Sequence, residues 1–177
     1  TTATALLITS LIELGMTPVL AVDADPNSNL HEALGIELRE TLGSMREEAF
    51  TKSIPPGMSR IEFIKYRLRQ VLVESSGYDL VAMGRPEGTG CYCFANNLLS
   101  ESMRLLEDEY RFVVIDTEAG MEHISRQTTR DVDILLLVSD MSMRGVISAA
   151  RMKELIKELR TSVDRIALVI NRADGDL

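Results

Sequence analysis

The sequence is poor in cysteine: its 177 residues include only Cys91 and Cys93, which stand one residue apart. Two cysteines are too few for the disulfide framework of a small secreted protein, and a reducing cytoplasm fits this composition better. The chain also lacks an apolar run of about 18 residues, the length that a helix needs to cross a bilayer. We therefore expect a cytoplasmic protein with no evident membrane segment in this sequence.

Positive charge is also scarce. The chain holds 19 Lys and Arg residues against 27 Asp and Glu residues, which leaves a formal net charge of −8 at pH 7. Such a surface repels phosphate backbones, so we expect no nucleic-acid partner. Because the first residue is Thr1 rather than Met, and no basic leader follows it, we expect a piece of a longer protein without a signal peptide.

Short apolar runs alternate with amphipathic stretches, and this alternation predicts the fold. Thr1 to Leu14 has leucines at helical spacing and ends at Gly15, which predicts a first helix. Further helices are predicted near 97–107 and 146–159. Apolar runs that end in polar residues or glycine predict buried strands over 18–25, 78–86, 112–120, 133–140 and 165–172. The order predicts an α/β fold, a mostly parallel sheet with helices on both faces, in one domain over residues 1–177.

Residues 40–70 depart from this alternation. The segment from Glu40 to Arg69 is charged, contains Pro55-Pro56-Gly57 and has no strand pattern. We interpret it as an irregular excursion that contains one helix, near Arg60 to Val73.

Acidic residues and glycines follow the predicted strands, at the sheet edge where ligands bind in such folds. Asp23 and Asp25 follow the first strand, and Asp116 ends another, four residues before Gly120. A strand-end aspartate holds the water shell of Mg²⁺ in nucleotide hydrolases, and a nearby glycine lets the backbone swing toward a γ-phosphate. For one aspartate, a merely solvated carboxylate is the better interpretation. Several on one edge favour a nucleotide site.

Thr1 and Thr2 open the first helix. In a P-loop, a lysine followed by a serine or threonine opens such a helix, and the hydroxyl binds Mg²⁺. The glycine-rich loop and its lysine are absent from this sequence, and a threonine at a helix start is more often simply a cap. The threonines therefore indicate a P-loop only in combination with the acidic strand ends.

The Cys-x-Cys pair predicts a metal site shared between two chains. Thiols two residues apart cannot readily form a disulfide, but in an extended segment both point to one side. Two thiolates supply half of a tetrahedral site for nickel or zinc, and a two-fold homodimer supplies the other half. The flanking Gly88 and Gly90 suit an exposed loop. The alternative is that Cys91 and Cys93 are small buried apolar residues.

Four stretches resemble the deviant P-loop ATPases that include MinD, ParA and the nitrogenase iron protein: TTATALL, VDADPNSNL, VVIDTEAGMEHISRQTTRDVDILLLVSD and LVINR. Within that group, GCYCFANN and DTEAGMEHISRQTTRDVD are most similar to the maturation factors of carbon monoxide dehydrogenase. The resemblance covers nearly the whole chain except Glu40 to Arg69. It implies a P-loop NTPase-like fold and a dimeric, ATP-hydrolysing protein that helps load nickel into an enzyme's cluster.

The resemblance also implies roles for individual residues. Asp25 would position the attacking water, Gly120 would be the glycine of the second switch, and Asn171 would read the adenine edge. The residues implied around Mg²⁺ and the phosphates of ATP are Thr1, Thr2, Asp23 and Asp116, and the pair implied to hold Ni²⁺ or Zn²⁺ is Cys91 and Cys93. The chain departs from the family because it lacks the glycine–lysine loop and stops soon after Asn171. We therefore expect a P-loop ATPase domain truncated at both ends, with ATP hydrolysis in the intact protein.

Three functions compete at this point. The first is an ATP-dependent metallochaperone that inserts nickel into carbon monoxide dehydrogenase or a related nickel enzyme, and the Cys pair favours it. The second is a MinD- or ParA-type positioning ATPase without metal chemistry. The third is a nucleotide-free interaction domain, which the absent glycine–lysine loop would permit.

Overall fold

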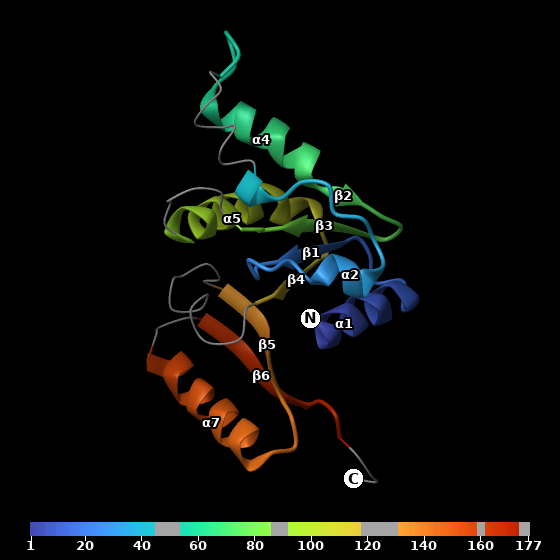
Figure 1. Cartoon of the computed structure of the whole chain (residues 1–177), viewed down its shortest axis with the longest axis vertical. Coiled ribbons are helices and arrows are strands. Elements are labelled where there is room, and N and C mark those ends of the chain that lie inside the picture. The colour runs from blue at the N-terminus through green and yellow to red at the C-terminus, as the bar shows by residue number, and fades with distance from the viewer. Residues whose placement is uncertain (45–53, 86–91, 118–130, 159–161, 174–177) are drawn as a thin grey trace. The chain divides into compact units, whose positions relative to one another are not determined.

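The computed structural model describes residues 1–44, 54–85, 92–117, 131–158 and 162–173 (Figure 1). The chain forms two compact units, Thr1–Ala119 and Gly120–Leu177. No helix in the described ranges is long and apolar enough to span a membrane.

The first unit is built on a four-stranded sheet in the order β2-β3-β1-β4. Its longer strands are β1 (Val19–Asp23), β3 (Tyr78–Ala82) and β4 (Phe112–Asp116), and β1 pairs with the other two in parallel. The short strand β2 (Val73–Glu74) runs antiparallel to β3 at the edge. Every residue of β1 is buried, as an apolar run in a central strand covered on both faces requires. The three predicted strands of this unit are confirmed.

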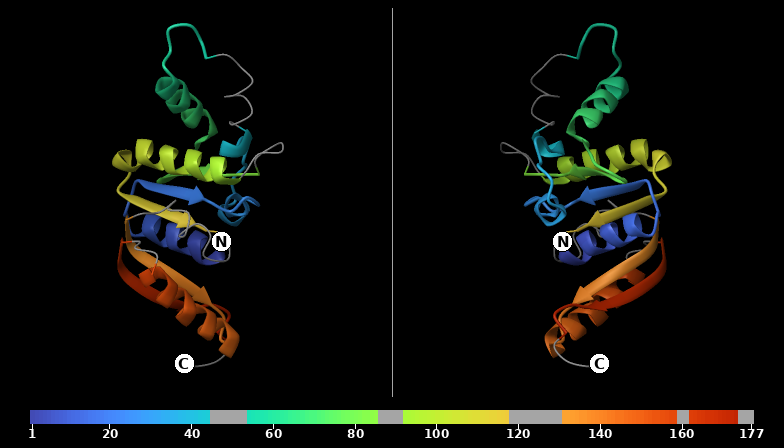
Figure 2. Two further views of the ribbon diagram at one scale, coloured as in Figure 1. Left: turned by 90° about the vertical axis from the view of Figure 1, so that its left-hand side faces the viewer. Right: turned by 90° about the vertical axis from the view of Figure 1, so that its right-hand side faces the viewer.

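Helices cover both faces of this sheet, with α1 and α2 on one side of the strands and α5 on the other (Figure 1). Figure 2 shows the same layering of the first unit from two sides. The helices are α1 (Thr2–Glu13), α2 (Leu30–Leu34), α4 (Arg60–Val71) and α5 (Tyr92–Leu106), which the short 3₁₀ turn η1 (Glu107–Glu109) follows.

Side chains alternate along each strand, so successive residues of β1 enter two different cores. One core joins the sheet to α1 and α2 and contains Ala5, Ile8, Val19, Ala21, Leu30, Tyr78 and Leu80. The other joins it to α4 and α5 and includes Leu20, Val22, Leu68, Val81, Met83 and Leu99. The prediction of helices on both faces is confirmed in this unit.

The predicted helix in the 40–70 excursion is present as α4. Ser59 begins it with a capping box, in which the Ser59 hydroxyl accepts the Glu62 N–H and the Glu62 carboxylate accepts the Ser59 N–H. The helix ends at Val71 rather than Val73, because Val73 and Glu74 pair with β3 instead.

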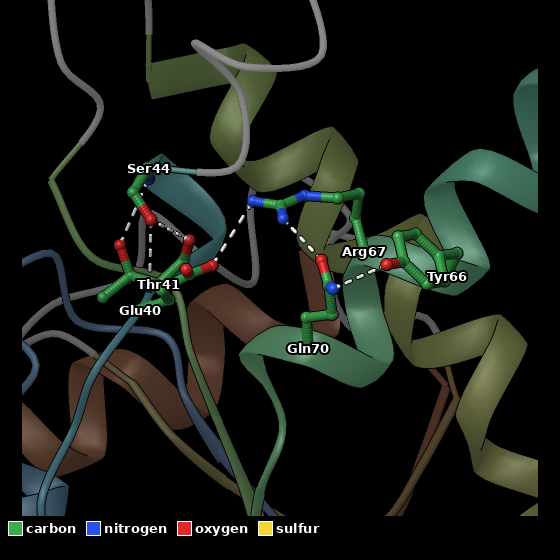
Figure 3. A network of polar contacts seen from close by, with 6 residues as sticks. All are labelled: Glu40, Thr41, Ser44, Tyr66, Arg67 and Gln70. Atoms are coloured by element: carbon green, nitrogen blue, oxygen red, sulfur yellow. Dashed lines mark hydrogen bonds and ion pairs between the residues drawn. The ribbon is translucent and has the colours of Figure 1, made fainter. Parts of the chain in front are cut away.

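Polar contacts fasten α4 to the beginning of the excursion (Figure 3). The Arg67 guanidinium lies 3.3 Å from Glu40 Oε2 and also donates to Gln70 Oε1. Beside this pair, Thr41 and Ser44 exchange hydrogen bonds between side chains and backbone N–H groups. The two ends of the excursion are therefore joined by an ion pair, and α4 also packs into the core of the first unit.

The second unit contains two parallel strands, β5 (Asp131–Ser139) and β6 (Ser162–Ile170), and the helix α7 (Met143–Glu158) lies between them in sequence. Leu137, Ala149 and Ile156 form the buried core between this strand pair and the helix. The predicted strands and intervening helix are confirmed, although β6 begins three residues before the predicted run at Arg165.

Candidate functional site

The carboxyl ends of the parallel strands bring two predicted site residues together. Asp23 ends β1 and Asp116 ends β4, and they are register partners on adjacent strands. Directly beyond them, the Ala24 N–H donates to the Asp116 carbonyl oxygen at 2.8 Å. The location of these two acidic strand ends on one sheet edge is therefore as predicted.

Asp23 is fully buried, and its carboxylate accepts hydrogen bonds from backbone N–H groups that follow it in the chain. Oδ1 accepts the Asp25 N–H at 3.1 Å, and Oδ2 accepts the Leu30 N–H at 2.9 Å. Burial raises the pKa of Asp23 from its ordinary value of 3.8 to about 6, against the lowering effect of these two hydrogen bonds. The negative charges of Asp116 and Asp25 raise this pKa further. Asp23 thus holds the loop in place, although the burial of its negative charge costs free energy.

Residues 24–29, which we call the Asp25 loop, connect β1 to α2. The Asp25 side chain turns back on this loop: its Oδ1 accepts the Asn27 backbone N–H at 2.8 Å and the Asn27 side-chain amide at 3.0 Å. The second oxygen, Oδ2, receives no hydrogen bond from the described residues, and Asp25 is only half-buried. One carboxylate oxygen is therefore available to a water molecule or a ligand.

Asp116 contacts the beginning of α1. Its Oδ1 accepts the Thr4 hydroxyl at 2.7 Å and lies 3.0 Å from the backbone nitrogen of Thr1. Its Oδ2 is buried and has no hydrogen-bond partner among the described residues. Thr4 was not among the predicted site residues; its spacing of three from Thr1, which puts both on one helix face, is the signal that would have indicated it.

The unpartnered oxygen of Asp116 fits a divalent cation or a water molecule bound to one. Buried carboxylate oxygens nearly always have a partner, and a buried acceptor without one costs about 1–3 kcal/mol. Mg²⁺ prefers carboxylate, hydroxyl and water oxygens and usually needs only one or two carboxylates, because it keeps several waters. Asp116 with the neighbouring Thr1 offers that donor set, although no three His, Cys, Asp or Glu side chains of the described residues form a metal-binding group.

The remaining predicted nucleotide residues are Thr2, Gly120 and Asn171. Asn171 follows β6 in the second unit, where its N–H donates to the Ser139 carbonyl at 2.7 Å and its side-chain oxygen accepts the Arg172 N–H at 2.9 Å. It is exposed at the carboxyl end of its strand, as predicted. Thr2 is exposed in the first turn of α1, and Gly120 lies outside the described residues.

The predicted extended conformation of the Cys-x-Cys pair is wrong for Cys93. Cys93 is the second residue of α5, which begins at Tyr92 rather than near Asn97. The sequence from Tyr92 to Asn97 contains no glycine or proline, so nothing in it prevents the helix from beginning at Tyr92. Cys91 lies outside the described residues, and the shared metal site stays a prediction.

Comparison with known proteins assigns the chain to a family. A family model described as an AAA domain matches residues 1–169. The chain belongs to this AAA domain family. An ATP-binding protein of Methanocaldococcus jannaschii is 46% identical to this AAA domain over 158 residues, which cover 87% of the chain and 62% of the relative. The carbon monoxide dehydrogenase accessory protein CooC of Rhodospirillum rubrum is 29% identical over 160 residues, which cover 80% of the chain and 59% of that relative.

Solved structures show the same fold. A ParA family ATPase from Chlorobium tepidum matches this AAA domain with a TM-score of 0.70 at 20% identity, covering 99% of the chain and 69% of that structure. MinD of Pyrococcus horikoshii, complexed with Mg-ADP, matches with a TM-score of 0.67 at 20% identity. The match covers 97% of the chain and 64% of that structure. The predicted α/β, P-loop NTPase-like fold is confirmed. The chain spans about three-fifths of the length of the two curated relatives described above.

Proposed function

We propose that the whole protein binds Mg-ATP at the carboxyl edge of the first unit and hydrolyses it. The observation that carries this proposal is the buried Oδ2 of Asp116 beside the beginning of α1, which has no hydrogen-bond partner in the described part of the chain. The family assignment and the ATP-binding relative at 46% identity support it. We also propose that both units act as one ATPase domain, since a single family model extends across them.

The proposed roles follow the geometry of this edge. Asp116 and the hydroxyl of Thr1 would hold Mg²⁺, which supplies positive charge against the phosphate oxygens when it is bound. The buried Asp23 orders the backbone of the Asp25 loop, while the available oxygen of Asp25 would orient the attacking water. Thr2, Gly120 and Asn171 would contact the nucleotide in the roles that the resemblance implies.

The negative charges at this edge favour the binding of ATP together with a cation. Asp23, Asp25 and Asp116 lie on or directly after adjacent strand ends, and a polyphosphate carries the same sign of charge. Like charges at short range in a partly buried site repel one another. ATP should therefore bind with Mg²⁺ and lose most of its affinity when the cation is removed with EDTA.

The deciding experiment compares Asp25→Asn with the parent in the full-length protein. The amide keeps the size of the side chain but is a weaker acceptor, so ATP affinity should stay nearly unchanged while hydrolysis falls by about 10²-fold or more. Asp108→Asn is the matched control, because Asp108 is exposed and lies in η1, which precedes the amino end of β4 and not its carboxyl end. A full rate of hydrolysis in Asp25→Asn would remove Asp25 from the mechanism, and a parent without ATPase activity would refute the proposal.

We further propose that the ATPase handles a metal cargo. The chain is 29% identical to an accessory protein of carbon monoxide dehydrogenase and contains the Cys-x-Cys pair. In this proposal two chains form a homodimer, Cys91 and Cys93 of both hold one Ni²⁺ or Zn²⁺ ion, and a nickel enzyme such as carbon monoxide dehydrogenase receives it. A MinD- or ParA-type positioning ATPase is the alternative, and a metal-free dimer with full ATPase activity would favour it.

A further inference from the structure

The Asp25 loop is held at both of its ends by side chains. The buried Asp23 carboxylate, directly before the loop, accepts the N–H of Asp25 near its beginning and the N–H of Leu30 directly after its end. Near its other end lies Ser28, which is 6% exposed and has a φ of 52°. A residue other than glycine in this left-handed region is strained, and such a conformation persists only where its surroundings over-determine it.

Ser28 connects the loop to a distant part of the chain. Its hydroxyl oxygen accepts the N–H of Gly84, just beyond β3, at 3.1 Å, and this hydrogen bond is buried. The same hydroxyl donates to the Asp25 carbonyl oxygen at 3.3 Å, and that carbonyl also accepts the Ser28 N–H at 3.0 Å. A single hydroxyl group therefore joins the main chain of Asp25 to the end of strand β3.

The partner of Ser28 is itself tightly packed. Gly84 has a φ of +66°, and a Cβ added to it would lie 2.2 Å from Thr41 Oγ1, so its backbone touches the Thr41 side chain. A second link lies beside the first, because the Arg85 guanidinium donates to Asn27 Oδ1 at 2.5 Å. Asn27 is also the residue that binds the Asp25 carboxylate. The segment after β3 is thus a fixed support for the Asp25 loop.

We propose that Ser28 is a positioning residue for ATP hydrolysis, an inference that rests on the proposed role of Asp25. Its hydroxyl holds the main chain of Asp25 at a constant distance from β3, and so keeps the available carboxylate oxygen where the attacking water must be oriented. Ser28 touches no reacting atom in this proposal. Small displacements of a catalytic group reduce turnover steeply, while substrate affinity depends on other contacts.

Two substitutions distinguish a positioning role of the Ser28 hydroxyl from an effect on protein stability alone. Ser28→Ala removes the hydroxyl and keeps the strained φ, whereas Ser28→Gly removes the hydroxyl and relieves the strain. In the full-length protein we expect kcat to fall by about 10-fold in both variants, while the Kd for Mg-ATP changes by less than about 3-fold. Ser59→Ala is the matched control, because it also deletes a hydroxyl that accepts a backbone N–H, but at the exposed cap of α4. It should lower stability and leave kcat unchanged.

Amide hydrogen exchange tests the anchor independently of catalysis. The Gly84 amide should exchange faster in both Ser28 variants than in the parent and in Ser59→Ala. Unchanged protection of Gly84 would overturn the inference whatever the rate of ATP turnover. If Asp25→Asn is inactive and Ser28→Gly turns over ATP at the full rate, the positioning role fails while the proposed function stands. A parent without ATPase activity would instead refute the proposed function, and with it the catalytic role of Ser28.

Discussion

Replacing Asp23 by asparagine should change the pH dependence of folding stability. The Asp23 carboxyl is fully buried, and its pKa rises from 3.8 to about 6. A raised pKa means that the native protein binds a proton that the unfolded chain has already lost between these pH values. The stabilising contribution of that proton is therefore complete below about pH 4 and disappears as pH rises through about 6.

The magnitude follows from the size of the pKa change. A change of the Asp23 pKa from 3.8 to about 6 corresponds to a free energy of about 3 kcal/mol. At pH 7 the buried, ionised carboxylate lowers the stability of the native protein by this amount. Asparagine cannot ionise and so escapes this cost, but its Nδ2 would face the backbone N–H of Asp25 or Leu30 in place of an acceptor. That mismatch costs about 1–3 kcal/mol at every pH. The variant should thus be less stable than the parent near pH 4 and equal or more stable near pH 7.

Urea denaturation in EDTA-containing buffer between pH 4 and pH 7.5 measures this effect. Subtracting the parent's free energy of unfolding from that of Asp23→Asn cancels the titration of the groups that do not interact with Asp23. We expect the difference to change by about 3 kcal/mol in favour of the variant across this range. Asp108→Asn, an exposed control, should give a nearly constant difference. A constant difference for Asp23→Asn as well would show that burial does not raise the pKa of this carboxyl.

The remaining predictions concern Gly84, Asn171 and the Cys-x-Cys pair. Gly84→Ala should lower the free energy of unfolding by about 2 kcal/mol or more, because φ is +66° and the new Cβ would lie 2.2 Å from Thr41 Oγ1; unchanged urea denaturation would contradict this packing. Asn171→Ala should weaken ATP binding by about 1–3 kcal/mol in titration calorimetry, and equal affinities of the parent for ATP and GTP would argue against adenine recognition. Native mass spectrometry should find one metal ion per dimer in the parent and none when Cys91 and Cys93 are both replaced by serine; an ion retained in the double variant would exclude the shared site.

The sequence by itself determined the order and type of the longer regular elements, but not the short strand β2. Parallel strands covered on both faces have near-continuous apolar runs, so β1, β3 and β4 were evident from local composition. The end of α1 before Gly15 and the capping box that begins α4 are likewise encoded by a few adjacent residues. Acidic residues directly after such strands indicated which sheet edge would carry a site.

Only the tertiary structure decided which of these residues meet and what surrounds them. The order β2-β3-β1-β4 makes Asp23 and Asp116 neighbours, although they are far apart in sequence. The burial of Asp23, the contact of Thr4 with Asp116 and the bond from Gly84 to Ser28 all depend on that order. Apolar periodicity reports which face of an element is buried, but pairing between strands depends on packing across the whole core, which no short stretch of sequence encodes.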